Sequence, residues 1–273
     1  MSDEPAHPWP PWYAPLALVL GLIVGAFGTV LVESFAHAGG ASLTNIPPGI
    51  NDAATLVQDL CFVAAAVFLA ARVAPVSRAQ FGLRTGRALW KAVLAVLLGL
   101  GVFYGLSYAW FALLQRSGAE RGLVNDLGGN GGTLEILAAC AVICVVAPIC
   151  EEILFRGFIY RALRNWRGPW PAAVITGILF GLVHGASAPA IDLLPLAVFG
   201  VMLSALYEWT GSLYPCIALH ALNNSLAFGS DEGWAWRIVE LVAGSLLAIA
   251  VVLAIVEFAG RRLPQSRRGI FGR

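Results

Sequence analysis

The stretch AACAVICVVAPICEEILFRG, residues 138–157, runs from an apolar segment that is able to lie in lipid directly into two carboxylates and a guanidinium group. Such charges cost about 2.5–3.5 kcal/mol each at the middle of a membrane helix, so they persist there mainly where they pair or take part in chemistry. Glu151, Glu152 and Arg156 are therefore the first candidate functional residues.

The composition of the whole chain is that of a membrane protein. Of its 273 residues, 59% are hydrophobic and only 12% are charged, with a mean hydropathy of +0.77, far from the balance of a soluble domain. A transmembrane helix needs about 20 apolar residues, and about eight segments approach this length. We predict an all-α, polytopic membrane helix bundle of about eight transmembrane helices with a buried polar cavity. The expected spans are residues 14–38, 53–74, 88–114, 133–163, 170–185, 191–209, 213–229 and 234–259.

Three parts are expected along the chain. Residues 1–132 hold three spans and a short segment, residues 76–87, that is expected to lie at the cytoplasmic lipid interface because it mixes apolar residues with arginines. Residues 133–229 form the core with the candidate site. Residues 230–273 hold the last span and a basic tail.

Most of the basic residues fall on one predicted side of the membrane. The positive-inside rule makes this side cytoplasmic, which predicts a multi-pass protein of the cell membrane with both termini in the cytoplasm. The basic residues form short clusters rather than one polar face, so no nucleic-acid partner is expected. The three clusters are Arg72, Arg78, Arg84, Arg87 and Lys91; Arg156, Arg161, Arg164 and Arg167; and Arg261, Arg262, Arg267, Arg268 and Arg273.

Further polar residues lie inside the predicted spans. His184 occurs in FGLVHG, and His220 and Asn224 occur in HALNN. Counted from the expected cytoplasmic ends of their spans, at about 1.5 Å per residue, these groups and Glu151 lie at depths of roughly 12 to 21 Å. Three helices are therefore expected to contribute to one buried polar site.

Helical spacing indicates which groups share a face. Glu152 and Arg156 are four residues apart with the acid first, the favourable order for an ion pair. Glu151 lies about 100° around the helix from Glu152 and is free to point into a cavity. His220 and Asn224 are also four apart and are expected to reach one bound group.

Each feature also has a purely structural interpretation. An EExxxR string is often a charged helix boundary, and a lone histidine in a span is often a packing residue. For other charged residues in the spans, such as Asp59 and Glu208, boundary or helix-pairing roles are preferred, although Asp59 is a candidate for lining the cavity. The conjunction of glutamates, histidines and an asparagine at one depth favours a catalytic site.

Three motifs in order give this segment a family resemblance. EEILFR matches EExxxR, FGLVH matches FxxxH, and HALNN matches HxxxN. The chain therefore resembles, over residues 133–228, the CPBP family of intramembrane proteases, which includes type II CAAX prenyl endopeptidases and bacteriocin-processing enzymes. The resemblance implies an endopeptidase with a cavity open to the cytoplasm, acting on a membrane-associated protein or peptide in the lipid bilayer.

The resemblance also implies roles for the six residues. Glu151 becomes the general base for water, Glu152 and Arg156 an orienting pair, and His184, His220 and Asn224 the remaining catalytic groups. His184 is expected to hold the water, while His220 and Asn224 donate to the oxyanion. Asn223, beside Asn224, leaves open which amide faces the site.

Three alternatives stay open at this stage. The chain fits a noncatalytic adaptor or chaperone that uses the cavity to hold a partner helix, or a transporter that relays protons, although it shows no evident repeat. Glu151, His184 and His220 also make a one-carboxylate, two-histidine set suited to catalytic zinc, without an HExxH helix. Zinc is therefore an open cofactor, and metal-independent catalysis by a glutamate is preferred.

Overall fold

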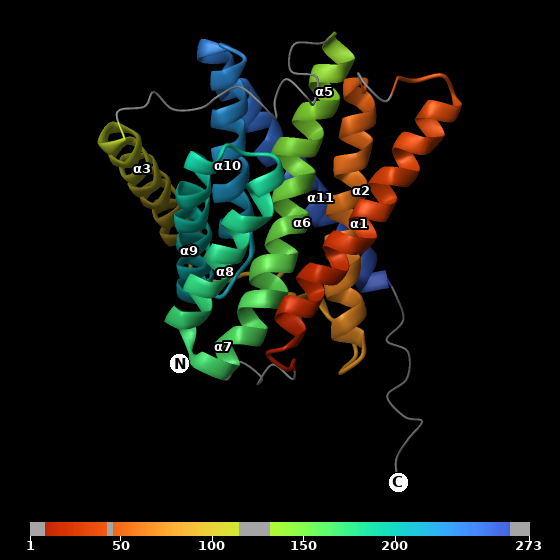
Figure 1. Ribbon diagram of the computed structural model, residues 1–273. Helices are drawn as coiled ribbons and strands as arrows, with labels where there is room; N and C mark the ends of the chain where they lie inside the picture. The colour runs from red at the N-terminus through yellow and green to blue at the C-terminus, as the bar shows by residue number, and fades with distance from the viewer. Residues whose placement is uncertain (1–8, 43–45, 115–131, 263–273) are drawn as a thin grey trace.

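The computed structural model describes residues 9–42, 46–114 and 132–262, with side chains to residue 258. Within these ranges every regular element is a helix, which confirms the all-α prediction (Figure 1). The elements are α1 (Tyr13–Ala38), α2 (Pro48–Ala71), η1 (Arg78–Phe81), α3 (Leu89–Leu113), α5 (Thr133–Ala141), η2 (Val142–Val146), α6 (Ala147–Glu152), η3 (Ile153–Tyr160), α7 (Arg161–Arg167), α8 (Pro169–Val183), η4 (His184–Ala186), η5 (Ala190–Asp192), α9 (Leu193–Thr210), α10 (Tyr214–Asp231), η6 (Ala235–Arg237) and α11 (Ile238–Arg262).

Seven helices of the described chain are long and apolar enough to cross a membrane. Together with α10, they correspond to the eight expected spans, and α10 falls outside the seven because of its polar residues. The expected start of the second span at residue 53 was wrong, since α2 begins at Pro48. Proline suits the first turn of a helix, where its missing N–H leaves no hydrogen bond unmade.

One long helix, Thr133–Arg167, runs through the centre of the molecule as α5, η2, α6, η3 and α7 (Figure 1). It has two π-helical stretches, η2 and η3, which lie on either side of α6. Alpha-helical and π-helical turns thus alternate around the Glu151–Glu152 pair, and π turns inside α-helices are frequent at functional sites.

The other helices are arranged around this central helix. The pair α1 and α2 lies on one side of it and the pair α8 and α9 on the other, while α3 is at the outer edge beside α9 (Figure 1). Helix α10 packs against α6, α9 and η2, and α11 covers α10. The central helix is therefore enclosed on several sides, which explains how it can bury charged side chains.

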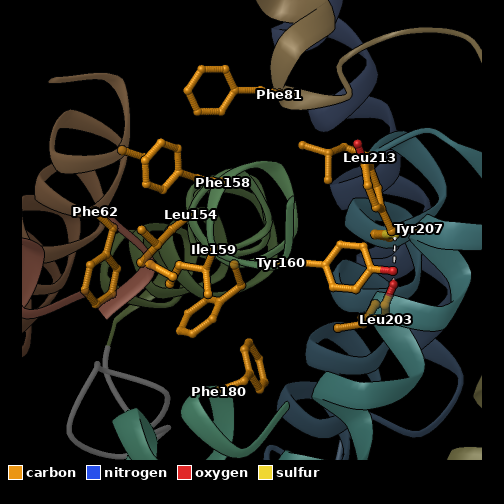
Figure 2. Close-up of a cluster of buried hydrophobic side chains, with 14 of the residues drawn as sticks. Phe62, Phe81, Leu154, Phe158, Ile159, Tyr160, Phe180, Leu203, Tyr207 and Leu213 are labelled. Carbon is orange, nitrogen blue, oxygen red and sulfur yellow. Dashed lines mark hydrogen bonds between the residues drawn. The ribbon is translucent and has the colours of Figure 1, made fainter. Parts of the chain in front are cut away.

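Side chains of the central helix pack into the hydrophobic core on two opposite sides. Figure 2 shows Leu154 and Phe158 reaching toward Phe62 of α2, whereas Tyr160 points to the opposite side, toward Tyr207 of α9. These five side chains are all buried. The half of the central helix after Glu152 is thus held from two directions at once.

The link between α2 and α3 folds onto the core. Phe81 is 3% exposed, and its ring centroid lies 5.3 Å from that of Trp9 and 6.3 Å from that of Phe158. Gly82 follows with a φ of +80°, and a Cβ there would meet the Tyr207 side chain at 2.6 Å. Its carbonyl accepts a hydrogen bond from the Leu213 backbone N–H at 2.8 Å. Phe81 is therefore a core residue, which the expectation of an interfacial segment had missed.

Helices α8 and α9 approach each other at glycines. A Cβ on Gly200 would lie 2.7 Å from Gly177 Cα, and a Cβ on Gly181 would lie 2.6 Å from the Leu193 carbonyl oxygen. Small residues let membrane helices pack backbone to backbone. This close packing fixes the position of Phe180 and of the Gly200 carbonyl, both of which contact the candidate site.

Candidate active site

The Glu152 carboxylate is the centre of a buried polar network. Its Oε1 accepts a hydrogen bond from Arg156 Nη1 at 2.7 Å and lies 3.0 Å from His220 Nδ1. Glu152 and Arg156 are both 0% exposed, and His220 is 3% exposed. The expected ion pair between Glu152 and Arg156 is present, and His220 joins it from α10.

Arg156 has further partners besides Glu152. Its Nη2 donates to the Gly200 carbonyl at 2.9 Å, and its guanidinium carbon lies 4.6 Å from the centroid of the Phe180 ring. A guanidinium group over an aromatic face is attracted by the ring's quadrupole. A charge that is fully removed from water is thus compensated by a carboxylate, a carbonyl and a π-system.

Glu151 is in a different environment from Glu152. Glu151 is partly exposed, and its buried Oε2 has no hydrogen-bond partner among the described residues. None of the ion pairs found in the described chain includes Glu151, whereas Glu152 is committed to Arg156 and His220. Of the two adjacent carboxylates, Glu151 is therefore the one that is free to act on water or substrate.

Phe180 contacts both histidines. Its ring centroid lies 4.9 Å from that of His184 and 5.6 Å from that of His220. His184 Nδ1 is 2.7 Å from the Phe180 carbonyl oxygen, an acceptor, so Nδ1 carries the proton and Nε2 is free to accept. His184 directly follows α8 as its C-cap residue and is partly exposed, whereas His220 lies in an aromatic pocket that also includes Phe199, 5.7 Å away.

Asn224 binds the central helix at the π turn. In η2 the Ala147 N–H donates to the Val142 carbonyl, five residues back. In the same register the Ile143 carbonyl would need the N–H of Pro148, which proline lacks. Asn224 Nδ2 supplies the missing donor, 3.0 Å from the Ile143 oxygen.

The second amide of α10 supports the first. Asn223 Nδ2 lies 3.4 Å from Asn224 Oδ1. Asn224 thus reaches the central helix directly, and Asn223 contacts the oxygen of the Asn224 amide.

The six expected residues are brought together to different degrees. Glu152, Arg156 and His220 are joined directly, and His184 is joined to them through Phe180. In the described part of the chain, no hydrogen bond links Glu151 to His184, His220 or Asn224. The backbone acceptors on Ile143 and Gly200 were missed, and the only sequence signals for them are Pro148 and the glycines.

The positions of Glu151, His184 and His220 bear on the zinc alternative. Among residues 9–42, 46–114 and 132–262, no three His, Cys, Asp or Glu side chains converge closely enough to hold a metal ion. His220 Nδ1 is engaged by Glu152, His184 Nδ1 is engaged by the Phe180 carbonyl, and the Phe180 ring contacts both imidazoles. Glu151, His184 and His220 as placed here do not fit a three-ligand metal site.

A second charged cluster pairs the central helix with α9. Arg164 donates to both oxygens of Glu208, at 2.6 Å and 2.7 Å, and the Tyr160 hydroxyl donates to Glu208 at 2.9 Å. Glu208 therefore has the helix-pairing role that its position in the sequence suggested.

Comparison with known proteins identifies relatives of this chain. The family model described as type II CAAX prenyl endopeptidase Rce1-like matches residues 133–226. The chain is 25% identical over 138 residues to "Putative membrane peptidase YdiL" of Bacillus subtilis, an alignment that covers 47% of this chain and 55% of the relative. It is 26% identical over 132 residues to "UPF0177 protein YxdF" of Lactococcus lactis, covering 47% and 71%.

These matches cover only part of the chain. The chain spans about half the length of the relative from Bacillus subtilis. No solved structure matches the chain significantly. The family segment contains all six candidate site residues. The resemblance drawn from the three motifs is confirmed, since residues 133–226 match the Rce1-like family model.

Proposed function

We propose that this protein is an intramembrane endopeptidase that hydrolyses a peptide bond of a membrane-associated protein or peptide, with Glu151 as the base that activates water. The observation that carries the proposal is that two adjacent carboxylates lie in different environments. Glu152 is buried between Arg156 and His220, whereas Glu151 is partly exposed and has no ion-pair partner among the described residues.

The proposed reaction needs one proton to move twice. Glu151 takes a proton from water while the water oxygen attacks the carbonyl carbon of the substrate, and the carbonyl becomes an oxyanion. Glu151 then gives this proton to the amide nitrogen as the C–N bond breaks. His184 accepts through Nε2 and is suited to hold the water, because its Nδ1 is bonded to the Phe180 carbonyl.

Two groups on α10 are the proposed oxyanion donors. Asn224 Nδ2 uses one of its two hydrogens on the Ile143 carbonyl and keeps the other for the substrate. His220 Nδ1 donates to the Glu152 carboxylate, so His220 Nε2 donates to an oxyanion only when the ring is charged. Glu152 thus acts through His220 rather than on the substrate.

Orientation and location are part of the proposal. In Figure 1 the start of α1, the α2–α3 link and the turn after α7 lie at the same end of the bundle. Basic residues gather in this link and this turn, so this end is proposed to face the cytoplasm, with both chain ends on that side. The Arg261–Arg273 tail, most of which lies outside the described residues, strengthens the argument by its sequence alone. The cell membrane is the proposed location.

A comparison of membrane proteomes tests the proposal. Cells that express the wild-type chain are compared with cells that express Glu151→Gln, and new protein N-termini are counted. Glu240→Gln, which changes an exposed glutamate of α11, is the matched control. We expect a set of termini that is present with wild type and Glu240→Gln and absent with Glu151→Gln. If the Glu151→Gln cells yield the same termini as wild type, the protein is a noncatalytic adaptor or a differently catalysed enzyme.

Metal dependence is tested separately on purified protein. Activity against a substrate found in the proteome comparison is measured after exhaustive treatment with a membrane-permeant chelator, together with elemental analysis. We expect cleavage to survive. Stoichiometric zinc, with activity lost on removal and restored on addition, would overturn the glutamate mechanism.

A further inference from the structure

Residues 81–87 of the α2–α3 link, which we call the strap, lie against the turn between α9 and α10. The pairing is reciprocal at one residue of the strap. Arg84 Nε donates to the Gly211 carbonyl at 3.0 Å, and the Arg84 carbonyl accepts a hydrogen bond from Ser212 Oγ at 2.6 Å. The side chain and the backbone of Arg84 therefore bind two consecutive residues of the turn.

These bonds meet backbone groups at the ends of two helices. The last carbonyls of a helix and its first N–H groups have no partner inside the helix. Helix α9 ends at Thr210, and the Gly211 carbonyl just beyond it is bound by Arg84, a cation at the negative end of the helix dipole. Helix α10 begins at Tyr214, whose N–H donates to Ser212 Oγ at 3.3 Å. The Ser212 hydroxyl thus joins the strap to the first turn of α10.

The strap also lies on the central helix. A Cβ on Gly157 would be 3.0 Å from the Phe81 carbonyl oxygen and 3.3 Å from Leu213 Cδ1. The next carbonyl of the strap, that of Gly82, accepts a hydrogen bond from the Leu213 N–H at 2.8 Å. Gly157 directly follows Arg156 in the chain. The strap, the start of α10 and the central helix therefore meet beside a residue of the candidate site.

The two helices that this turn joins carry the partners of the buried ion pair. Helix α9 supplies the Gly200 carbonyl, 2.9 Å from Arg156 Nη2, and α10 supplies His220 Nδ1, 3.0 Å from Glu152 Oε1. His220 follows Ser212 by eight residues, which is about 12 Å along a helix. A shift of the turn is carried along α10 as a shift of His220 relative to Glu152.

We propose that Arg84 and Ser212 are positioning residues, which fix the α9–α10 turn against the central helix and so hold His220 on Glu152 Oε1. This inference rests on the proposed function, because it gives the two residues a role in aligning a proposed oxyanion donor. It also gives Arg84 a task inside the fold, in addition to the positive charge that it contributes to its end of the bundle.

The kinetic test removes both side-chain bonds. Arg84→Ala/Ser212→Ala should lose kcat by about ten-fold or more with KM unchanged, the scale of one lost hydrogen bond to a charged group. Arg84→Lys keeps a cationic donor and should lose less than Arg84→Ala. The matched control is Arg72→Ala/Thr85→Ala, which removes one arginine and one hydroxyl from exposed positions of the same link and should resemble wild type. Wild-type kcat in the first double variant, or an equal loss in the control, would overturn the inference.

Folding is measured on the same preparations, because a lower stability alone is not positioning. Rates are compared at a temperature at which thermal unfolding shows every variant to be folded. If the double variant does not fold, Ser212→Ala, which removes a single hydroxyl, is judged by the same criteria.

A magnetic resonance measurement tests the position of His220 without turnover. In protein labelled with ¹⁵N-histidine, Arg84→Ala/Ser212→Ala should displace the His220 ring resonances. Those of His184 should stay in place, because its Nδ1 bond and its ring contact are both made to Phe180 on the adjoining helix α8. Unmoved His220 resonances, or an equal displacement of His184, would refute the positioning role. Displaced His220 resonances in a protein whose wild type cleaves nothing would refute the proposed protease function alone.

Discussion

Glu152 and His220 lie 3.0 Å apart, although 68 positions separate them in the chain. Both His220 and Arg156 contact the same oxygen, Oε1, of the Glu152 carboxylate. One buried oxygen therefore ties α10 to the central helix. This relationship makes Glu152 a residue for assembling the site and distinguishes it from the adjacent Glu151.

Replacing Glu152 is expected to destabilise the fold. In Glu152→Leu the fully buried Arg156 loses its counter-ion, and breaking a buried pair in this way costs about 3–5 kcal/mol. The free energy of unfolding in mixed detergent micelles measures the loss. The double variant Glu152→Leu/Arg156→Leu should recover part of it, and Glu240→Leu should be close to wild type. A stability of Glu152→Leu equal to wild type would show that the pair contributes nothing.

The two histidines should respond differently to removal. His184→Ala should abolish cleavage at nearly unchanged stability, since His184 is partly exposed at the end of α8. His220→Ala should abolish cleavage and also lower stability, because its ring packs between Phe180 and Phe199 and bonds Glu152. Cleavage and thermal unfolding are measured on the same preparations. Equal stability losses for both variants would contradict this assignment.

Removal of Asn224 should leave residual activity. Losing one oxyanion donor typically lowers the rate by about 10² to 10³. Asn224→Ala also leaves the Ile143 carbonyl without its donor, so a lower unfolding temperature is expected too. Asn223→Ala should have the smaller effect on kcat, because Asn223 contacts only the Asn224 amide. A larger loss in Asn223→Ala would mean that Asn223 is the amide that faces the substrate.

Gly200 should not tolerate a methyl group. A Cβ there would lie 2.7 Å from Gly177 Cα, so Gly200→Ala must separate α8 from α9 and displace the carbonyl that binds Arg156. Both stability and cleavage should fall. Gly105→Ala on α3 is the control, since a Cβ there meets nothing within 4 Å. Its stability should be unchanged or higher by about 0.5–1 kcal/mol, the usual gain from alanine in a helix.

The membrane orientation is open to a labelling test. Ser77 in the α2–α3 link and Ser230 near the end of α10 are exposed, and this link and the end of α10 lie at opposite ends of the bundle in Figure 1. Single cysteines at these positions, in a background without reactive thiols, should react with an impermeant reagent in intact cells only at Ser230→Cys. Labelling of Ser77→Cys would invert the proposed topology, and labelling of both or neither would reject it.

Helix periodicity explains what the sequence made predictable. Apolar length gave the helices, and the four-residue spacing gave the Glu152–Arg156 pair, because both depend on local geometry. Helical spacing could not predict the other partners of Arg156, because they lie on other helices. The Gly200 carbonyl is a backbone atom on another helix, and its position depends on the close packing of α8 against α9.

Sequence patterns also misjudged Phe81 and left Asp59 undecided. Phe81 lies among arginines, which suggests a membrane surface, but the turn at Gly82 brings it to Trp9 and Phe158 in the core. Asp59 has an ordinary sequence context. Its burial is a property of how α2 packs on its neighbours, and no motif encodes it.

The π turn before Pro148 has a consequence for length changes in the central helix. A π turn holds one residue more than an α turn, so deleting one residue between positions 142 and 147 would restore a regular helix. The extra residue is absorbed within this one turn, so its deletion would leave the outer half facing α2 and α11 as before, in the same phase relative to Glu151. The same deletion within the α-helical stretch of α6 would rotate one half of the central helix by about 100° against the other. A single deletion between positions 142 and 147 should therefore be tolerated far better than a single deletion in α6.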